Sequence, residues 1–254
     1  LSHTNAIWKE RMPNHTYNEY QIRKDEPVNA RYYYRTNGLV NLDKSNMPSY
    51  QPEAYQKPGC PIIVDLNGDG QITVEDVDMK NVIPSLYWGL GNTFTYKNWD
   101  LDVFIYSQLG VDKYNDVYSW TSGRGLGNQT NNMSVYIKDV WHSELNPNGT
   151  IPGIAYEMAS VSLPGGAGTD IGYENSSFVR VRNITLGYNF KPNQLGTLSK
   201  LLSGIRVYVD VQNPFTFTGY TGLDPEVNTG GNYKGGKAEY PQTRTFSLGT
   251  KLSF

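Results

Sequence analysis

The feature that most constrains the fold of this chain is a two-residue alternation of apolar and polar side chains, which recurs in separate stretches. In residues 203–213, SGIRVYVDVQN, aliphatic side chains occupy positions 205, 207, 209 and 211, and the positions between them are polar or aromatic. Successive side chains of a strand point to opposite faces, so this pattern predicts β-strands with one apolar and one polar face. The predicted strands are 85–96, 99–109, 177–190, 203–213 and 243–254.

The composition favours sheets with a wet face over a protein built around an aliphatic core. Hydrophobic residues make up 38% of the chain and charged residues 18%, whereas aromatic residues reach 13%, with 20 Tyr. This mixture suits sheets with one solvated face, or a wall between lipid and water. The formal net charge of −2 gives no electrostatic case for nucleic-acid binding. The sequence contains no run of about 18 apolar residues, so it predicts no transmembrane helix.

The segments that connect the predicted strands alternate between short and long. The turn at 97–98 is tight and 191–202 is moderate, whereas 11–84, 110–176 and 214–242 are long. Compact soluble domains rarely contain several such loops, but outer-membrane barrels have short periplasmic turns and long extracellular loops. The sequence therefore predicts an all-β fold, the wall of an antiparallel transmembrane β-barrel with long extracellular loops.

Two local features refine this prediction. The apolar positions of 177–190 change parity near Asn183, which indicates either a β-bulge or a strand that leaves the membrane there; we favour the second interpretation. Residues 131–143 have near-helical apolar spacing and predict a short helix.

Residues 64–77, VDLNGDGQITVEDV, have the spacing of an EF-type calcium loop. Such a loop takes oxygens from positions 1, 3, 5, 7, 9 and 12 and needs a glycine at position 6, where the chain doubles back with positive φ. The predicted metal ligands are Asp65, Asn67, Asp69, Gln71 through its carbonyl, Thr73 and Asp76, with Gly70 at the turn. The expected cofactor is a divalent cation, Ca²⁺ or alternatively Mg²⁺. An isolated loop is a structural staple more often than a sensor.

The sequence contains no pattern that is typical of an enzyme active site. The three histidines are scattered, no HExxH or GxSxG motif occurs, and Cys60 is the single cysteine. Asp100 and Asp102 share a strand face, but a polar strand face ordinarily meets water. We therefore expect that the protein is not an enzyme.

The aromatic side chains divide into two groups. Those at predicted strand ends are expected to form interfacial girdles: Trp88, Tyr96, Trp99, Tyr188 and Phe254. Those in the long loops could contact substrate or pack within the loops: Tyr32, Tyr34 and Trp120.

The last residues, SLGTKLSF, alternate and carry Gly249, Leu252 and Phe254. This pattern resembles the signal by which outer-membrane barrels are passed to their assembly machinery. In a soluble protein the same exposed edge would be an aggregation hazard. The chain starts Leu1-Ser2-His3 without an initiator Met or signal peptide, so we expect a processed product or a fragment.

Several motifs together resemble the C-terminal part of SusC/RagA-type TonB-dependent transporters of Bacteroidetes. They are, in order, NGL (37–39), VDLNGDGQIT (64–73), YWGLGNTFTYKNWDLDVFIYSQLG (87–110), SSFVRVRNITLGYNF (176–190), IRVYVDVQNPFTFTGYTGLDPEVN (205–228) and YPQTRTFSLGTKLSF (240–254). The resemblance implies that residues 1–254 belong to an outer-membrane barrel of about 22 strands with a plugged lumen. Residues 11–84 would form an extracellular loop region, with the metal loop at 65–76.

The resemblance also implies the partners. These are the remaining N-terminal part of the same transporter, with its plug and other strands, a SusD-like surface lipoprotein, TonB acting through that missing part, and outer-membrane lipid. The expected substrate is a glycan or peptide oligomer, and no nucleic acid is involved.

Two alternatives stay open from the sequence. One is a soluble secreted calcium-binding β-module that binds carbohydrate or protein, although a second calcium repeat is missing. The other is a TonB-dependent receptor for siderophores or cobalamin, whose barrel wall would look similar.

Overall fold

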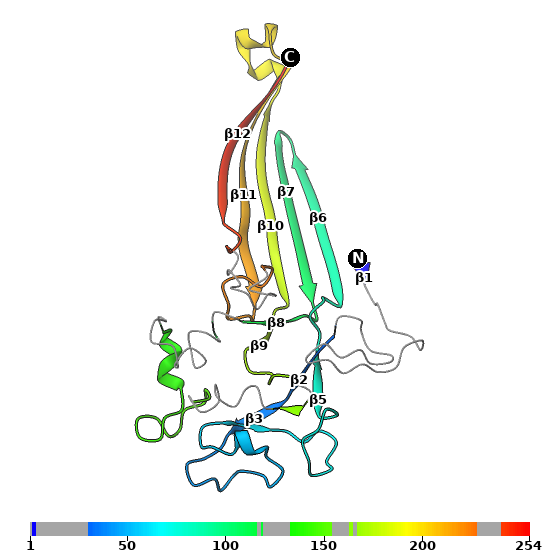
Figure 1. Cartoon of the computed structure of the whole chain (residues 1–254). Coiled ribbons are helices and arrows are strands. Elements are labelled where there is room, and N and C mark those ends of the chain that lie inside the picture. The colour runs from blue at the N-terminus through cyan, green and yellow to red at the C-terminus, as the bar shows by residue number, and fades with distance from the viewer. Residues whose placement is uncertain are drawn as a thin grey trace.

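The structure of this chain is a computed structural model, which describes residues 2–3, 30–115, 118, 133–153, 163–164, 167–227 and 240–254. Its main element is a six-stranded antiparallel sheet with the strand order β1-β6-β7-β10-β11-β12 (Figure 1). The strands of this sheet are β1 (Ser2–His3), β6 (Leu86–Tyr96), β7 (Trp99–Leu109), β10 (Phe178–Phe190), β11 (Gly204–Thr218) and β12 (Thr245–Ser253). Within the described residues, no helix has the length and apolar character needed to cross a membrane.

All five strands predicted from the alternation are present, and the largest difference is that β11 continues to Thr218. The sheet is mostly antiparallel β-structure as predicted, but it has two free edges. Among the described strands, β1 pairs only with β6 and β12 pairs only with β11, so closure into a barrel is not seen in them.

The parity change near Asn183 is a β-bulge, so the explanation that we favoured from the sequence is wrong. The pairing of β10 with both β7 and β11 shifts between Val181 and Asn183: Arg182 is an extra residue opposite β7, and it faces two residues, 213 and 214, of β11. On the facing strand, Asn213 has φ of +50°, a conformation that Asn tolerates better than most residues. The bulge keeps the apolar side chains on one face above and below it.

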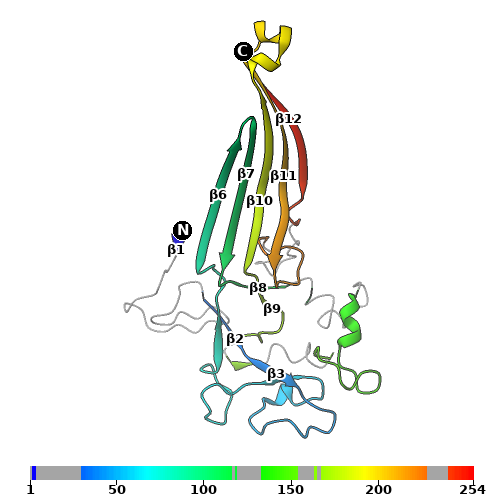
Figure 2. The ribbon, with the colours of Figure 1, turned by 180° about the vertical axis from the view of Figure 1, so that it is seen from behind.

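The two ends of the sheet carry connections of very different length. At one end lie the 97–98 turn and the 3₁₀ segments η4 (Pro192–Gln194) and η5 (Gly196–Lys200). At the other end lies a loop region that contains most of the remaining described residues (Figures 1 and 2). Its strand pairs are β2 (Arg31–Tyr34) with β5 (Val77–Lys80), β3 (Thr36–Leu39) with β4 (Pro61–Ile63), and β8 (Asp112–Tyr114) with β9 (Tyr173–Asn175). The long connections therefore gather at one end, as the alternation of loop lengths predicted.

Two short 3₁₀ helices of the loop region have both ends within the described residues. They are η1 (Glu53–Tyr55) and η2 (Val135–Asp139), the second capped by the Ser134 hydroxyl. The helix predicted over 131–143 is thus reduced to η2 among the described residues; positions 131–132 lie outside them.

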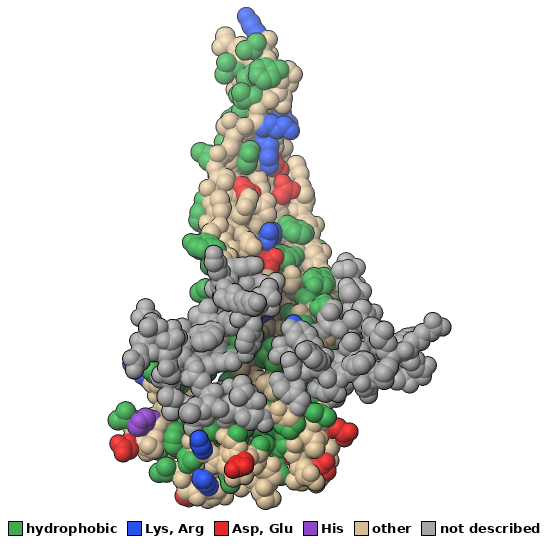
Figure 3. All heavy atoms as spheres, viewed as in Figure 1, with side chains coloured by type: hydrophobic (Ala, Val, Ile, Leu, Met, Phe, Trp, Pro, Cys, Tyr) green, Lys and Arg blue, Asp and Glu red, His purple; other side chains and the backbone are tan. Residues whose placement is uncertain are grey.

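The sheet has one apolar and one polar face, as predicted. Apolar side chains stay exposed along it, including Phe94 at 59%, Val209 at 47% and Leu248 at 76%. Charged side chains run along the middle of the sheet in the view of Figure 3, and hydrophobic ones project at its edges. Among the described residues, the main buried hydrophobic cluster lies in the loop region, around Tyr32, Tyr34 and Ile63. The sheet therefore does not use its apolar face to build a core.

Glycines on the polar face make room for side chains of the neighbouring strand. Gly249 of β12 lies opposite Tyr208 of β11, and a Cβ at Gly249 would lie 2.4 Å from the tyrosine ring. In the same way, a Cβ at Gly187 would lie 2.6 Å from Arg206 Nε and Asp100 Oδ2. An aromatic ring that covers a cross-strand glycine restores the packing which the missing side chain cannot provide.

This packing predicts that Gly249→Ala lowers the thermal stability of the full-length protein. Because Tyr208 must move, the expected cost is about 1–3 kcal/mol. Adding Tyr208→Ala should recover part of the loss, because the two positions are in contact. Gly91→Ala is the matched control, since its Cβ would meet Phe104 at 3.7 Å, an ordinary contact. Equal losses with and without Tyr208 would show that Gly249 acts in recognition during assembly rather than in packing.

Candidate functional site

The structure places Tyr32 and Tyr34, two of the predicted substrate contacts, inside the loop-region core. Their side chains are 1% and 0% exposed. The Tyr34 hydroxyl donates to the carbonyls of Thr73 and Pro164, at 2.9 Å each, and so ties β2 to the acidic loop. We therefore assign both tyrosines to packing. Trp120, the third predicted contact, lies outside the described residues.

The acidic loop at 65–76 has the backbone turn that the calcium-loop pattern predicted. Gly70 has φ of +81° and Gly68 has φ of +77°, and a Cβ at either position would meet no atom within 4 Å. The Asp65 carboxylate accepts the N–H groups of Gly68 and Gly70, at 2.7 and 2.8 Å. Glycine is thus needed at Gly70 for the conformation of the backbone, not for space.

Asp76 closes this loop from inside. Its carboxylate is buried and accepts N–H groups of Leu66, Asn67 and Thr73, at 2.7–3.3 Å. Burial by itself raises the pKa of Asp76, but the hydrogen bonds from Thr73, Asn67 and Leu66 outweigh it, and the pKa is lowered. A lowered pKa means that the ionised form stabilises the loop at neutral pH, and that this stabilisation is lost as acid protonates the group.

The other loop oxygens lie at the surface. Asp65, Asn67 and Asp69 are exposed or half-buried, and Asp69 accepts the N–H of Gln71 at 2.8 Å. Across the described residues, no three His, Cys, Asp or Glu side chains converge into a group that could hold a metal ion. The donor types are those that Ca²⁺ and Mg²⁺ take, hard oxygens from carboxylates, an amide and a carbonyl. Cation binding by this loop stays a prediction.

The polar face of the sheet carries a ladder of cross-strand hydrogen bonds. Asp100 pairs with Arg206 and accepts from Asn189 at 2.5 Å. Asp102 accepts the Thr93 hydroxyl at 2.5 Å, and Asp210 accepts the Thr185 hydroxyl at 2.6 Å. Asp100 and Asp102 therefore have separate partners and do not form an acid–base pair. The ladder holds the strands in register on the face that carries charges.

At the loop end of the sheet, a buried arginine fastens the segment that follows β11. Arg180 is 1% exposed, and its guanidinium donates to Asp224 at 2.9 Å, Glu226 at 2.7 Å and the Thr216 hydroxyl at 2.9 Å. Asp224 also accepts the N–H of Gln242 at 3.0 Å, so the same carboxylate reaches the segment before β12.

Two further cations support this contact. Arg182 lies 3.4 Å from Glu226, and the Lys113 ammonium donates to the carbonyls of Pro225 and Val227. The cluster connects β8, β10 and β11 with the segment 224–227. It joins the sheet to the loop region.

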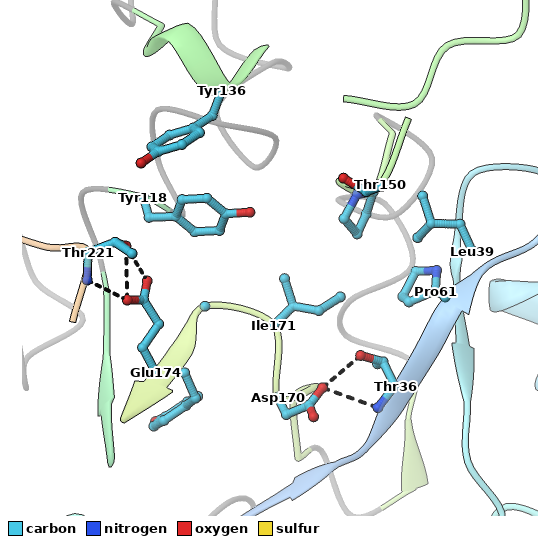
Figure 4. Close-up of a pocket in the computed structure, with 14 residues that line it drawn as sticks. Thr36, Leu39, Pro61, Tyr118, Tyr136, Thr150, Asp170, Ile171, Glu174 and Thr221 are labelled. Carbon is cyan, nitrogen blue, oxygen red and sulfur yellow. Dashed lines mark hydrogen bonds between the residues drawn. The ribbon is translucent and has the colours of Figure 1, made fainter. Parts of the chain in front are cut away.

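A cavity of about 480 Å³ opens in the loop region (Figure 4). One side carries Tyr118 and Tyr136, whose ring centroids are 5.4 Å apart in an edge-to-face arrangement. Leu39, Pro61 and Ile171 supply an aliphatic side. The cavity therefore lies between strands β3 and β4 on one side and the start of β9 on the other.

Two carboxylates line this cavity, and neighbouring groups orient both. Asp170 Oδ1 accepts the N–H and the hydroxyl of Thr36, at 3.2 and 2.8 Å. Glu174 accepts the N–H and hydroxyl of Thr221 and the amide of Asn115, all at 2.8–2.9 Å. Side chains held by such bonds present their remaining acceptor positions in a defined direction.

Sequence reasoning did not identify this cavity. Its walls come from residues 36–39, 61, 118, 136, 150–152, 170–174 and 221. No spacing rule connects segments so far apart, and each residue taken alone is ordinary for a loop. The one available signal was the aromatic excess in the long loops, which directed attention to Tyr32 and Tyr34 instead.

Comparison with known proteins gives a consistent result. No protein-family model matches the chain. The TonB-dependent receptor SusC of Bacteroides thetaiotaomicron is 34% identical over 208 residues, which are 80% of this chain and 19% of the relative. The TonB-dependent receptor P3 of Formosa agariphila is 28% identical over 242 residues, covering 92% of this chain and 23% of the relative. The chain thus spans about a fifth of the length of the curated relatives that it matches.

Solved structures agree in fold. A chain in the structure of the RagAB peptide transporter aligns with a TM-score of 0.65 at 22% sequence identity, covering 93% of this chain and 24% of that chain. The RagAB peptide importer in its closed-closed state gives a TM-score of 0.64, also at 22% identity.

The buried position of Arg180 predicts a large effect of its removal. Arg180→Met leaves Asp224 buried without its cation, which should cost about 3–5 kcal/mol. The measurement is thermal unfolding of the full-length protein together with limited proteolysis of the segment 219–227. Arg35→Met is the matched control, because its ion pair with Asp78 is half-exposed and should contribute less than about 1 kcal/mol. Equal effects of the two substitutions would contradict the assigned role of Arg180.

Proposed function

We propose that this chain, which is homologous to a part of SusC/RagA-type TonB-dependent receptors, forms the C-terminal part of the wall of an outer-membrane transporter. TonB-dependent receptors are outer-membrane transporters and not enzymes. In this proposal the transporter imports oligomeric nutrients, glycans or peptides, with a SusD-like surface lipoprotein and with energy from TonB. The chain would contribute strands β6, β7, β10, β11 and β12 to the wall, and other parts of the receptor would supply the plug and the remaining strands.

The observation that carries this proposal is the uncovered apolar face of the sheet. Exposed side chains such as Phe94, Val209 and Leu248 would associate in water, whereas in a barrel they meet lipid. Strands β6 and β7 have 11 residues each, which matches the length of a tilted membrane-spanning strand, about 9–11 residues. A soluble calcium-binding module would need a second layer over this face.

The ends of the sheet support the same orientation. Next to the tight turn, Trp99 packs edge-on against Tyr188 with ring centroids 4.8 Å apart, and Tyr188 packs against Phe190 at 4.7 Å. Aromatic side chains of this kind gather where a membrane meets water. The short-turn end would then face the periplasm and the loop region the cell exterior.

The two similar proteins do not decide whether the substrate is a glycan or a peptide. RagAB is described as a peptide transporter, and SusC is a TonB-dependent receptor with higher sequence identity to this chain. The RagAB transporter supports a two-component importer. In our proposal the lipoprotein lies over the loop region.

We also propose that the loop 65–76 binds Ca²⁺ and braces the extracellular loops. The backbone turn at Gly70 and the surface oxygens of Asp65, Asn67 and Asp69 support this role. Tyr34 connects the loop to the core through the Thr73 carbonyl, so ordering of the loop would extend inward.

If this is correct, a calcium chelator lowers the melting temperature of the purified full-length receptor, and excess Ca²⁺ restores it. Asp65→Asn together with Asp69→Asn should abolish the response. Asp43→Asn, at an exposed loop position outside the motif, is the matched control. A melting temperature that is unchanged by chelation would remove calcium from the proposal without affecting the transport function.

The orientation of the faces predicts a contrast between two arginine substitutions in β11. Val209→Arg puts a charge in lipid near the membrane midplane, at a cost of about 2–4 kcal/mol, and should reduce the amount of assembled receptor in the outer membrane. Gln212→Arg, on the polar face of the same strand, should assemble normally. Heat-modified mobility of the receptor in membrane fractions measures both. Normal assembly of Val209→Arg with failure of Gln212→Arg would show that the faces are inverted.

A further inference from the structure

The cavity between Tyr118, Tyr136 and Ile171 lies directly beyond the loop end of the sheet. Thr221 lies three residues after β11 ends, and Glu174 belongs to β9, shortly before β10 begins. In the orientation proposed above, this place is the outer mouth of the transporter, where an incoming oligomer arrives. The cavity's volume of about 480 Å³ falls in the range of pockets that hold small ligands or single units of an oligomer.

The walls of the cavity favour a flat ligand with apolar faces and a polar rim. The Tyr136 side chain is 38% exposed, so its ring is open to contact. Leu39, Pro61 and Ile171 lie across the cavity from the two tyrosines (Figure 4). Tyrosine combines a large apolar face with a hydroxyl at its tip, and it holds a ligand with little loss of side-chain entropy.

The hydrogen-bonding groups favour a ligand rich in donors. Ionised carboxylates only accept hydrogen bonds. Asp170 uses Oδ1 for Thr36, and its Oδ2 accepts no hydrogen bond from any described residue, so Oδ2 can serve a ligand. The 14 described residues that line the cavity include no Lys, Arg or His. An anionic ligand would therefore meet two carboxylates without a compensating cation, which is unfavourable.

We propose that this cavity is a subsite for one uncharged sugar residue of an imported oligosaccharide. The sugar would stack its C–H face on Tyr136 and donate hydroxyl hydrogens to Asp170. This inference rests on the proposed transport function and adds the substrate class, neutral glycan. A peptide is disfavoured because its backbone presents donors and acceptors in equal number, whereas the two carboxylates only accept and none of the described lining side chains offers an N–H donor.

The test uses the full-length receptor with its lipoprotein, purified as a complex, and titration calorimetry with three probes. The probes are neutral oligosaccharides, uronate-containing oligosaccharides of equal length, and uncharged peptides of similar size. Neutral oligosaccharides should bind most tightly. Tyr136→Ala should weaken their binding roughly tenfold, consistent with the loss of one aromatic contact. Asp170→Asn, which keeps the shape of the side chain, should reduce the discrimination against uronates.

Tyr50→Ala is the matched control, because Tyr50 is a half-buried tyrosine of the same loop region that does not line the cavity. It should leave binding within about twofold of the wild type. Tyr136→Phe, which keeps the ring, should retain most of the affinity and show that the effect of the alanine substitution is not unfolding.

The remaining outcomes separate this inference from the proposed function. Peptide binding that depends on Tyr136 would overturn the assignment to sugar, and sugar binding unaffected by Tyr136→Ala would overturn the cavity as its site. Both results would leave transport intact. A receptor that reaches the outer membrane but imports no oligomer of any class would instead overturn the proposed function itself.

Discussion

The structure depends on one constraint: none of the described residues covers the apolar face of the main sheet. A six-stranded antiparallel sheet with exposed Phe94, Val209 and Leu248 is stable only where something other than water meets that face. Lipid satisfies this requirement without a second layer, and closure with further strands removes the free edges. The homology to outer-membrane receptors therefore agrees with the pattern of the two faces, because a wall in a membrane requires an outward apolar face.

The buried Arg180 cluster joins the sheet to the loop region, and these two parts are held together by different interactions. The sheet is held by its strand pairing and by polar ladders such as Asp100 with Arg206. The loop region has its own core around Tyr34 and Ile63. Arg180 connects them through Asp224 and Glu226. Because burial removes water from each charge, such an ion pair adds little net stability, whereas removing one partner is costly. The cavity proposed for a sugar residue lies beside this junction, so its geometry depends on the connection.

Side-chain identity and local spacing were sufficient for some of the structure but not for all of it. The five long strands, their two faces and the positive φ at Gly70 were all predicted correctly. The bulge at Arg182 was misinterpreted, because a parity change has two explanations that only strand pairing distinguishes. Tyr32 and Tyr34 were taken as candidate ligand contacts, because a sequence shows that a tyrosine is in a loop but not whether that loop has a core.

The sequence by itself determined the strands, their lipid-compatible face and the polar face, because a period of two is a local property that each stretch carries on its own. The metal-loop pattern is local in the same sense. Only the tertiary structure decided which loop residues meet: the burial of Tyr34, the partners of Arg180, and the cavity formed by Tyr136, Asp170 and Glu174. These contacts join distant segments, as with Thr36 and Asp170, which are 134 positions apart, and they arise from packing and charge pairing that no spacing along the chain encodes.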